Sequence, residues 1–329
     1  MTLLESDIYE IFEGLPFSAK SALHGKRFLI TGASGFLGQY LTEVARRVGT
    51  CTGLDLRGNG SDIIEHDACK PLGPLGAKAF DYIIHAAGNA SPALYKQKPL
   101  ETLEISYTGT KNVLEVARQN PGCRVLVCSS SEVYATPPAD QIPTPETYVG
   151  QVASMADRSV YDVGKLASET LAYAYHQQFD VDVVVVRPFN SYGPGLSVND
   201  YRILPNIATA LLRKEPVHIY GDGQQTRTFC YATDTIRGIL FALTQGSSGQ
   251  VYNVGSDGPE ITMRQLVEIT EEAIGRELPR VIAAHPSHYP KQEPSRRCPD
   301  ISRLRALGFS PRVKLVDGIK RYLQWAGAL

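Results

Sequence analysis

The sequence predicts an α/β protein built on a doubly wound parallel sheet, with a smaller lobe at the C-terminal end. From residue 26 onwards, short apolar runs alternate with longer segments of helical spacing, which is typical of a parallel sheet covered by helices on both faces. One run, Val181–Arg187, has β-branched residues at consecutive positions, as expected of a strand buried on both faces. After residue 188, Pro and Gly residues break the pattern and mark the start of the lobe.

Each element is predicted from its apolar spacing. We expect strands at Arg27–Thr31, Cys51–Asp55, Tyr82–His85, Arg124–Cys128, Val181–Arg187 and Val251–Val254. We expect helices at Phe36–Val48, Pro99–Arg118, Tyr161–Gln178, Ile203–Arg213, Asp234–Thr244, Met263–Ile274 and Leu315–Trp325. The chain therefore divides into an N-terminal extension (1–25), a sheet domain (26–188) and a second lobe (189–329) that is partly interleaved with the sheet domain.

The composition excludes several functional classes. The 329 residues carry 33 basic and 34 acidic side chains, so no basic excess indicates binding to nucleic acid or to an anionic membrane. No apolar run approaches the roughly 18 residues needed to span a bilayer. The six cysteines are irregularly spaced and form neither a disulfide framework nor a metal-binding pattern. We therefore expect a cytoplasmic protein without a metal site.

A glycine-rich turn follows the first expected strand. Residues 30–38 read ITGASGFLG, so Gly32, Gly35 and Gly38 form a Gly-x-x-Gly-x-x-Gly motif that opens a helix. Here the first glycine allows a tight turn, the second lets the backbone approach a pyrophosphate, and the third lets helix and strand pack closely. The helix N-terminus then faces the phosphates. The sequence thus predicts a Rossmann-type dinucleotide site, with cofactor contacts from Gly32, Ser34, Gly35, Phe36, Leu37 and Gly38.

Residues at the ends of later strands complete the expected cofactor site. Asp55 ends the second strand at about the sequence separation from the glycine motif that is expected of an acid bound to the adenosine ribose. Its charge repels a 2′-phosphate. This favours NAD over NADP. Asp67 follows a short third strand and is expected near the adenine. Ala86 and Ala87 follow the fourth strand, where small residues let the backbone lie against the cofactor.

Tyr161 and Lys165 form the expected chemical centre. Their i, i+4 spacing puts both side chains on one face of a helix. A tyrosine with its ordinary pKa of about 10 is a poor base, but a nearby ammonium and a positive nicotinamide ring favour the phenolate. Ser130 follows the strand Arg124–Cys128 and brings a hydroxyl to the same edge of the sheet. The pattern predicts removal of a hydroxyl proton while hydride leaves the same carbon.

Further short motifs lie between residues 26 and 325. They are Ala90-Ser91-Pro92 with Tyr95, Ser129–Tyr134 (SSSEVY), Tyr161-Asp162 with Gly164-Lys165, Arg187 with Phe189-Asn190, Gln225-Thr226-Arg227, and Arg297 with Pro299-Asp300-Ile301. Together with the glycine motif they resemble the extended short-chain dehydrogenases/reductases of the NAD-dependent epimerase/dehydratase family. Within that family the chain is most similar to UDP-glucuronate decarboxylases, also called UDP-xylose synthases.

The resemblance implies catalytic roles on a UDP-sugar. Tyr161 is expected to be the base at the sugar C4 hydroxyl, with Lys165 as its electrostatic partner and cofactor contact. Ser130 is expected to hold the same sugar oxygen, and Glu132 to lie near C5 and C6. Oxidation at C4 turns a hexuronate into a β-keto acid, from which carbon dioxide can leave before hydride returns.

The resemblance also implies the substrate contacts. Ser131 is expected near C6, and Tyr95 and Arg297 near the hexuronate carboxylate. Asn190 and Arg227 are expected to hold the diphosphate, since a fixed positive fork suits phosphate oxygens. The helices 99–118 and 159–178 are expected to pair with those of a second copy in a homodimer.

Three other functions remain open at this point. The related 4,6-dehydratases carry Asp-Glu where this chain has Ser131-Glu132, so an acid for the leaving hydroxyl is missing. A 4-epimerase needs no glutamate at that place, and Glu132 argues mildly against one. An NAD-binding regulator that has lost its chemistry is expected to lack Tyr161 or Lys165, and both are present.

Overall fold

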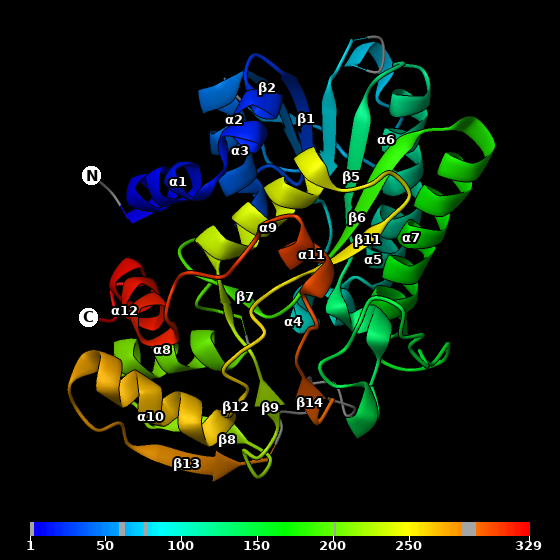
Figure 1. Cartoon of the computed structure of the whole chain (residues 1–329). Coiled ribbons are helices and arrows are strands. Elements are labelled where there is room, and N and C mark those ends of the chain that lie inside the picture. The colour runs from blue at the N-terminus through cyan, green and yellow to red at the C-terminus, as the bar shows by residue number, and fades with distance from the viewer. Residues whose placement is uncertain (1–2, 59–62, 76–77, 201, 285–293) are drawn as a thin grey trace.

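Seven strands of the described chain pair in parallel and form the main sheet (Figure 1). The computed structural model describes residues 3–58, 63–75, 78–200, 202–284 and 294–329. The strand order is β3 (Ile63–Glu65), β2 (Thr50–Asp55), β1 (Arg27–Thr31), β4 (Tyr82–His85), β5 (Arg124–Cys128), β6 (Asp182–Pro188) and β11 (Val251–Val254). This confirms the doubly wound sheet. The order reverses direction between β1 and β4, and at such a point a crevice forms beyond the carboxyl ends of the strands.

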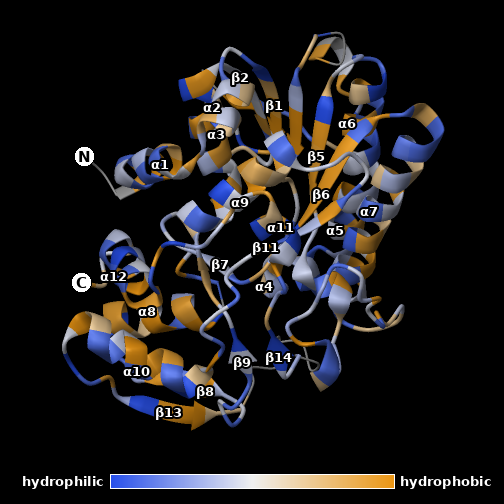
Figure 2. Cartoon of the chain, in the orientation of Figure 1, coloured by the Kyte–Doolittle hydropathy of each residue, from blue (hydrophilic) through white to orange (hydrophobic). Residues whose placement is uncertain are grey.

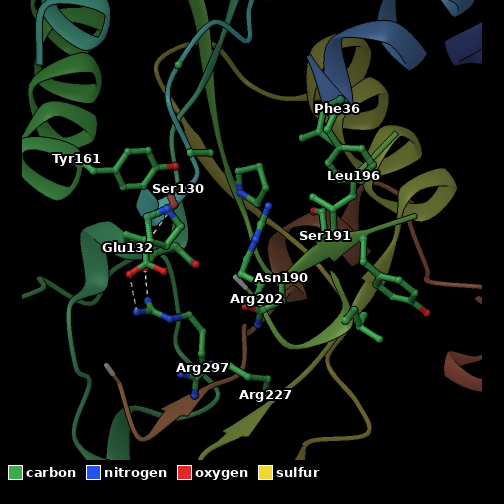
Figure 3. Close-up of a pocket in the computed structure, with 18 of the residues that line it drawn as sticks. Phe36, Ser130, Glu132, Tyr161, Asn190, Ser191, Leu196, Arg202, Arg227 and Arg297 are labelled. Carbon is green, nitrogen blue, oxygen red and sulfur yellow. Dashed lines mark hydrogen bonds and ion pairs between the residues drawn. The ribbon is translucent and has the colours of Figure 1, made fainter. Parts of the chain in front are cut away.

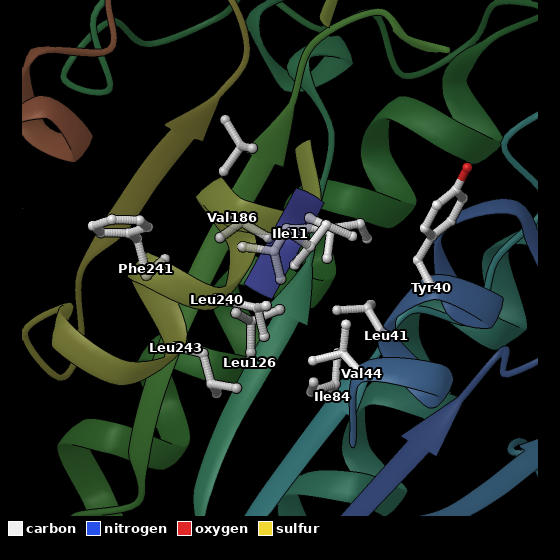
Figure 4. Packing of buried hydrophobic residues seen from close by; sticks show 14 of the residues in the cluster. Ile11, Tyr40, Leu41, Val44, Ile84, Leu126, Val186, Leu240, Phe241 and Leu243 are labelled. Carbon is white, nitrogen blue, oxygen red and sulfur yellow. The ribbon is translucent and has the colours of Figure 1, made fainter. Parts of the chain in front are cut away.

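Helices cover both faces of this sheet. One face carries α3 (Phe36–Val48) and α9 (Ala232–Gln245), and the other carries α6 (Thr110–Arg118) and α7 (Ser159–Phe179). Successive strand residues point to opposite faces. Leu126 therefore packs in the cluster of α3 and α9 (Figure 4), whereas its neighbours Val125 and Val127 pack in the cluster of α6 and α7. Figure 2 shows that the central strands are hydrophobic along most of their length, as burial on both faces requires.

The expected elements agree with the structure to within two residues, with one correction. The helix expected over Pro99–Arg118 is divided into α5 (Pro99–Glu104), a π-helical segment η2 (Ile105–Gly109) and α6. The segment passes close to the end of β4, because a Cβ on Gly109 would lie 3.2 Å from Cε1 of His85. A π turn takes up one extra residue, which apolar spacing alone does not reveal.

The N-terminal extension is part of the core. It forms α1 (Leu3–Gly14) and α2 (Phe17–Leu23), which pack on α9 and α3. Ile8 and Ile11 are fully buried there. The buried carboxylate of Asp7 accepts hydrogen bonds at 3.0 Å from the hydroxyls of Tyr40, on α3, and Tyr231, in the second lobe. The extension therefore connects the two lobes.

The second lobe has its own hydrophobic core. Its larger elements are α8 (Ile203–Arg213), β8 (Val217–Tyr220), α10 (Met263–Ile274), β13 (Arg280–Ala283) and α12 (Leu315–Trp325). Thr262 caps α10 in a capping box with Gln265. The shorter strands form two further small sheets, one of β7 (Ser191–Tyr192) and β10 (Cys230–Tyr231), and one of β9 (Thr226–Arg227), β12 (Ile261–Thr262) and β14 (Arg296–Arg297).

The chain crosses between the lobes more than once. α9 and β11 belong to the second half of the sequence, yet α9 packs on the main sheet and β11 pairs with β6 at its edge. Among the described helices, none has the length and apolar character required to cross a membrane.

Candidate active site

The glycine turn between β1 and α3 is built for close backbone contact. Gly32 has a φ of 73°, in the left-handed region that favours glycine. A Cβ on Gly32 would lie 2.7 Å from the backbone of Ala87, and a Cβ on Gly38 would lie 1.8 Å from the carbonyl oxygen of Gly32. Gly35 is the N-cap of α3, so the first N–H groups of that helix are free of helical partners at the carboxyl end of β1. The turn fits the pyrophosphate of a dinucleotide.

The two acids of the expected cofactor site lie on the β2 and β3 side of this turn. The carboxylate of Asp55 accepts a hydrogen bond at 2.9 Å from the N–H of Ser34, which places it directly beside the glycine turn. Asp67 accepts a hydrogen bond at 2.9 Å from the N–H of Cys69 and is held in a local turn after β3. Asp55 is thus placed to meet a ribose, while contact between Asp67 and adenine stays a prediction.

A pocket of about 340 Å³ opens at the carboxyl ends of the central strands, between the sheet and the second lobe. Every residue expected to act in catalysis or substrate binding lines it: Tyr95, Ser130, Ser131, Glu132, Tyr161, Lys165, Asn190, Arg227 and Arg297. The cofactor residues that line it are Gly35, Phe36, Leu37, Gly38, Ala86 and Lys165. The other cofactor residues, Gly32, Ser34, Asp55, Asp67 and Ala87, lie outside this lining.

Tyr161, Ser130 and Lys165 meet in the middle of the pocket. Tyr161 and Lys165 project from α7, and Ser130 follows β5 at the start of η3 (Ser131–Tyr134). Burial raises the pKa of Tyr161 to about 12, although a hydrogen bond with Ser130 opposes the rise. The Lys165 ammonium donates to the carbonyl of Cys128 at 2.7 Å and lies 5.8 Å from the centre of the Tyr161 ring. Tyr161 is therefore protonated here at neutral pH, and a positive charge beside it favours the phenolate.

Tyr95 has a buried hydroxyl that points to a ligand. It lies on α4 (Pro92–Gln97), is 2% exposed, and stacks on Tyr161 with ring centres 5.5 Å apart. Its hydroxyl has no hydrogen-bond partner within the described residues. Because an unpaired buried hydroxyl is costly, one that lines a pocket is available to donate to a bound molecule.

Glu132 is held between two arginines, Arg158 and Arg297, of which Figure 3 labels Arg297. Its carboxylate forms an ion pair with Arg158, and Arg297 donates to the same carboxylate at 2.9 Å. Arg297 also donates to the carbonyls of Ser131 at 2.5 Å and Ala135 at 3.2 Å. Burial by itself raises the pKa of Glu132, but the surrounding guanidinium groups outweigh it and hold that pKa below its usual range. Glu132 is therefore ionised, and Arg297, expected to meet the substrate carboxylate, already holds Glu132.

Two arginines of the site, Arg158 and Arg202, were not predicted, and Asp162 was quoted only within a motif, without a role of its own. Arg158 and Asp162 stand one helical turn apart at the start of α7, and Arg202 precedes α8. Arg158 and Arg202 line the pocket. Asp200 pairs with Arg202 at 2.9 Å. The i, i+4 spacing of Arg158 and Asp162 beside Tyr161 is a visible signal, but it does not reveal that Glu132 lies opposite.

Asn190 and Arg227 line the side of the pocket formed by the second lobe. The Asn190 amide donates to the carbonyl of Thr228 at 2.9 Å, and its φ is 39°. Arg227 donates to the carbonyl of Thr226 at 2.7 Å. These backbone contacts fix both side chains beside the pocket, where Figure 3 places them opposite Tyr161.

A buried polar network supports the loop that carries Ser130 and Glu132. Ser129 donates to Glu169 at 2.5 Å, and Arg187 binds both oxygens of Glu169 at 2.9 and 2.6 Å. Arg187 also donates to the Tyr134 hydroxyl at 2.7 Å, which donates in turn to Asn253 at 2.7 Å. The network ties the end of β5 to α7, β6 and β11, so the loop has little freedom to move.

The sheet, the glycine turn and the Tyr161, Lys165 and Ser130 cluster define a dinucleotide-dependent enzyme of the extended short-chain dehydrogenase/reductase type. More closely, the chain belongs to the NAD dependent epimerase/dehydratase family, whose sequence model matches residues 28–255. It is therefore an enzyme of a family that uses NAD and acts on nucleotide-linked sugars.

Individual relatives agree with this assignment. UDP-glucuronic acid decarboxylase 1 of Arabidopsis thaliana is 36% identical over 90% of this chain and 68% of its own length. The epimerase Mth375 of Methanothermobacter thermautotrophicus shares the fold with a TM-score of 0.82 and 25% identity, over 93% of this chain and 94% of its own. The protein MoeE5, solved with UDP-glucuronic acid and NAD, has a TM-score of 0.78 and 26% identity, over 91% of this chain and 98% of its own.

Proposed function

We propose that this protein is an NAD-dependent UDP-glucuronate decarboxylase. The observation that carries the proposal is the ionised Glu132, held by Arg297 and Arg158 in the pocket that contains Tyr161. Ser131 stands where the family's dehydratases carry an aspartic acid, so the acid that those enzymes use toward a leaving C6 hydroxyl is missing at this position. The similarity to plant decarboxylases over 90% of the chain supports the same reaction.

Tyr161 acts at the C4 hydroxyl of the sugar. The glycine turn and Asp55 would hold NAD, which would supply the hydride acceptor for oxidation at C4 and the hydride for its reversal. Tyr161 takes the proton of the C4 hydroxyl, and Ser130 donates a hydrogen bond to the same oxygen. The Lys165 ammonium, 5.8 Å from the Tyr161 ring centre, favours the phenolate that this transfer requires.

Loss of carbon dioxide follows from the position of the carboxylate relative to that ketone. The C5–C6 bond breaks, its electrons move toward the C4 oxygen as an enolate, and C6 leaves as carbon dioxide. The hydroxyls of Tyr161 and Ser130 donate to the enolate oxygen and stabilise its charge. A proton from water is then added at C5, where Glu132 is expected to lie. The hydroxyl of Tyr95, which has no partner among the residues that the structure describes, donates to the substrate carboxylate and so orients the C5–C6 bond.

The test is to supply the purified protein with NAD and UDP-glucuronate and to follow the products by mass spectrometry. The expected result is a UDP-pentose, or its 4-keto form, with release of carbon dioxide. UDP-glucose serves as the matched substrate, because it differs only at C6 and offers no carboxylate to lose. An isomer of unchanged mass indicates a 4-epimerase, which the fold shared with Mth375 makes the second candidate. Loss of water from UDP-glucose, or no reaction with UDP-glucuronate, refutes the proposal.

We further propose that the protein is a homodimer formed through α5, η2 and α7. Leu100 and Tyr107 are 78% and 50% exposed, and with Leu103 they form an apolar stripe at helical spacing. Tyr173 on α7 is exposed as well. Light scattering of the purified protein is expected to give twice the mass of one chain. Leu100→Asp is expected to give single chains. The control is Ile282→Asp, which changes an exposed apolar residue on β13 and is expected to leave the dimer intact. A wild-type mass of one chain refutes the proposal.

A further inference from the structure

Asp162 is a buried carboxylate that belongs to the Tyr161-Asp162 motif but to which the sequence assigns no role. It follows Tyr161 in α7 and is only 8% exposed. One of its oxygens, Oδ1, has no hydrogen-bond partner within the described residues. Its other oxygen lies 3.6 Å from Nε of Arg158. A buried carboxylate with one unsatisfied oxygen costs stability, so its position next to the active site requires an explanation.

Asp162 stands at one end of a row of alternating charges. Arg158 lies between Asp162 and Glu132, and Glu132 lies between Arg158 and Arg297. The row runs from α7 through η3 to β14, and so it joins the sheet domain to the second lobe beside Tyr161. The guanidinium of Arg297 is shared between Glu132 and two backbone carbonyls. Arg158 therefore provides the second charge that fixes the carboxylate of Glu132.

We propose that Arg158 and Asp162 are positioning residues of this reaction: Asp162 holds Arg158, and Arg158 holds the carboxylate of Glu132 beside the reacting sugar. The inference rests on the proposed function, because the proposed decarboxylation places Glu132 near C5 and C6 of the sugar. Neither residue has to touch the substrate. The arrangement lets one carboxylate outside the pocket lining control the orientation of another inside it.

The charge of Asp162 changes in the neutral pH range. Burial, and next the negative charge of Glu132, raise the pKa of Asp162 to about 7, against the opposing charges of Arg158 and Arg297. The charged and titratable groups that face it are Arg158 at the start of α7, Glu132 from η3, Arg297 from β14, and the hydroxyls of Tyr161 and Tyr95. Above neutral pH, Asp162 is ionised and pairs with Arg158. Below it, the pair is lost and Glu132 is held less firmly.

The first test compares kcat of the wild type, Asp162→Asn and Asp157→Asn for formation of the UDP-pentose, from about pH 6 to about pH 8.5. Asp157 is the matched control, since it lies five residues before Asp162, has a side chain that is 54% exposed, and is paired with Lys96 instead. The wild type is expected to gain activity as pH rises through about 7, whereas Asp162→Asn, which mimics the neutral acid, is not. At high pH the variant is expected to have a kcat lower by about tenfold, as for one lost charge-assisted contact. Parallel profiles overturn the inference.

A double-mutant cycle separates positioning from a general loss of structure. Arg158→Gln is expected to lower kcat by about tenfold or more at every pH, without weakening NAD binding. If Asp162 acts through Arg158, adding Asp162→Asn to Arg158→Gln lowers kcat by less than about twofold further. Additive losses overturn the inference.

A spectroscopic readout keeps the inference distinct from the proposed function. The part of the infrared signal of protonated carboxyls that disappears as pH rises through about 7 is expected in the wild type and is expected to be missing in Asp162→Asn, while the signal of Asp7, with a pKa of about 6, remains in both. This holds whichever sugar the enzyme uses. If wild-type protein leaves UDP-glucuronate unchanged, the proposed function fails, while the band and the kinetic comparison on the nucleotide sugar that is converted still test Asp162. If no band titrates with Asp162, the inference fails by itself.

Discussion

Asp7→Asn is expected to gain stability relative to the wild type as pH rises from about 4 to about 7. Asp7 is fully buried in α1 and receives hydrogen bonds from Tyr40 and Tyr231. Burial raises its pKa from 3.8 to about 6, although the two tyrosine hydroxyls and the charge of Arg321 oppose the rise. Protonated Asp7 is therefore favoured in the folded protein, and its ionisation at neutral pH costs stability.

The magnitude follows from the two pKa values. Because the folded pKa lies above the unfolded one, the stabilising contribution is fully present below pH 3.8 and is lost as pH rises through about 6. The difference between about 6 and 3.8, at about 1.36 kcal/mol per pH unit, corresponds to about 3 kcal/mol. Asparagine does not titrate, so the variant does not lose this contribution. Between pH 4 and pH 7, the unfolding free energy of Asp7→Asn is therefore expected to rise by about 2 to 3 kcal/mol relative to that of the wild type.

Urea unfolding followed by circular dichroism at several pH values measures this difference. Glu13→Gln is the control, because it makes the same chemical change on the same helix at an exposed position. The control is expected to follow the wild type. A difference between Asp7→Asn and the wild type that does not change with pH contradicts the reasoning, and means that Asp7 keeps an ordinary pKa or that α1 is not docked as the structure has it.

Three other substitutions test the site and its support. Tyr161→Phe is expected to lower kcat by about 10² to 10⁴-fold while calorimetry still detects sugar-nucleotide binding, and a variant with normal turnover excludes Tyr161 as the base. Gly38→Ala is expected to abolish NAD binding in a fluorescence titration, because a Cβ there would lie 1.8 Å from the carbonyl oxygen of Gly32; normal affinity argues against close packing at the turn. Arg187→Met is expected to lower the unfolding free energy by about 3 to 5 kcal/mol, since it leaves Glu169 buried without its ion pair, and a loss below about 1 kcal/mol shows that the network is not needed for stability.

Parts of the site could be predicted because their chemistry is local in sequence. The glycine turn requires Gly32, Gly35 and Gly38 at fixed spacing, and the structure shows the positive φ and the close contacts that this spacing implies. Tyr161 and Lys165 share a helix face through a spacing of four residues. Likewise, the six strands expected with bounds, all in the main sheet, lie within one residue of their observed positions, because burial on both faces leaves continuous apolar runs.

The π-helical segment and the role of the N-terminal extension could not be predicted in the same way. The segment Ile105–Gly109 depends on how the helix passes the end of β4, and the apolar spacing around it is that of an ordinary helix. The extension is amphipathic, but its sequence does not identify the surface that it covers. From the sequence, Asp7 is typical of an exposed acid on an amphipathic helix. The structure buries it against Tyr40 and Tyr231, which are distant in sequence.

The sequence by itself determined the doubly wound sheet, the dinucleotide turn and the Tyr161, Lys165 and Ser130 cluster in the pocket. Only the tertiary structure decided how their charges are paired. Glu132, Arg158 and Arg297 are far apart in sequence, and α7, η3 and β14 bring them into contact. The protonation states of Glu132 and Asp162 follow from that contact, because desolvation and the nearby charges act through space, and neither can be read from spacing along the chain.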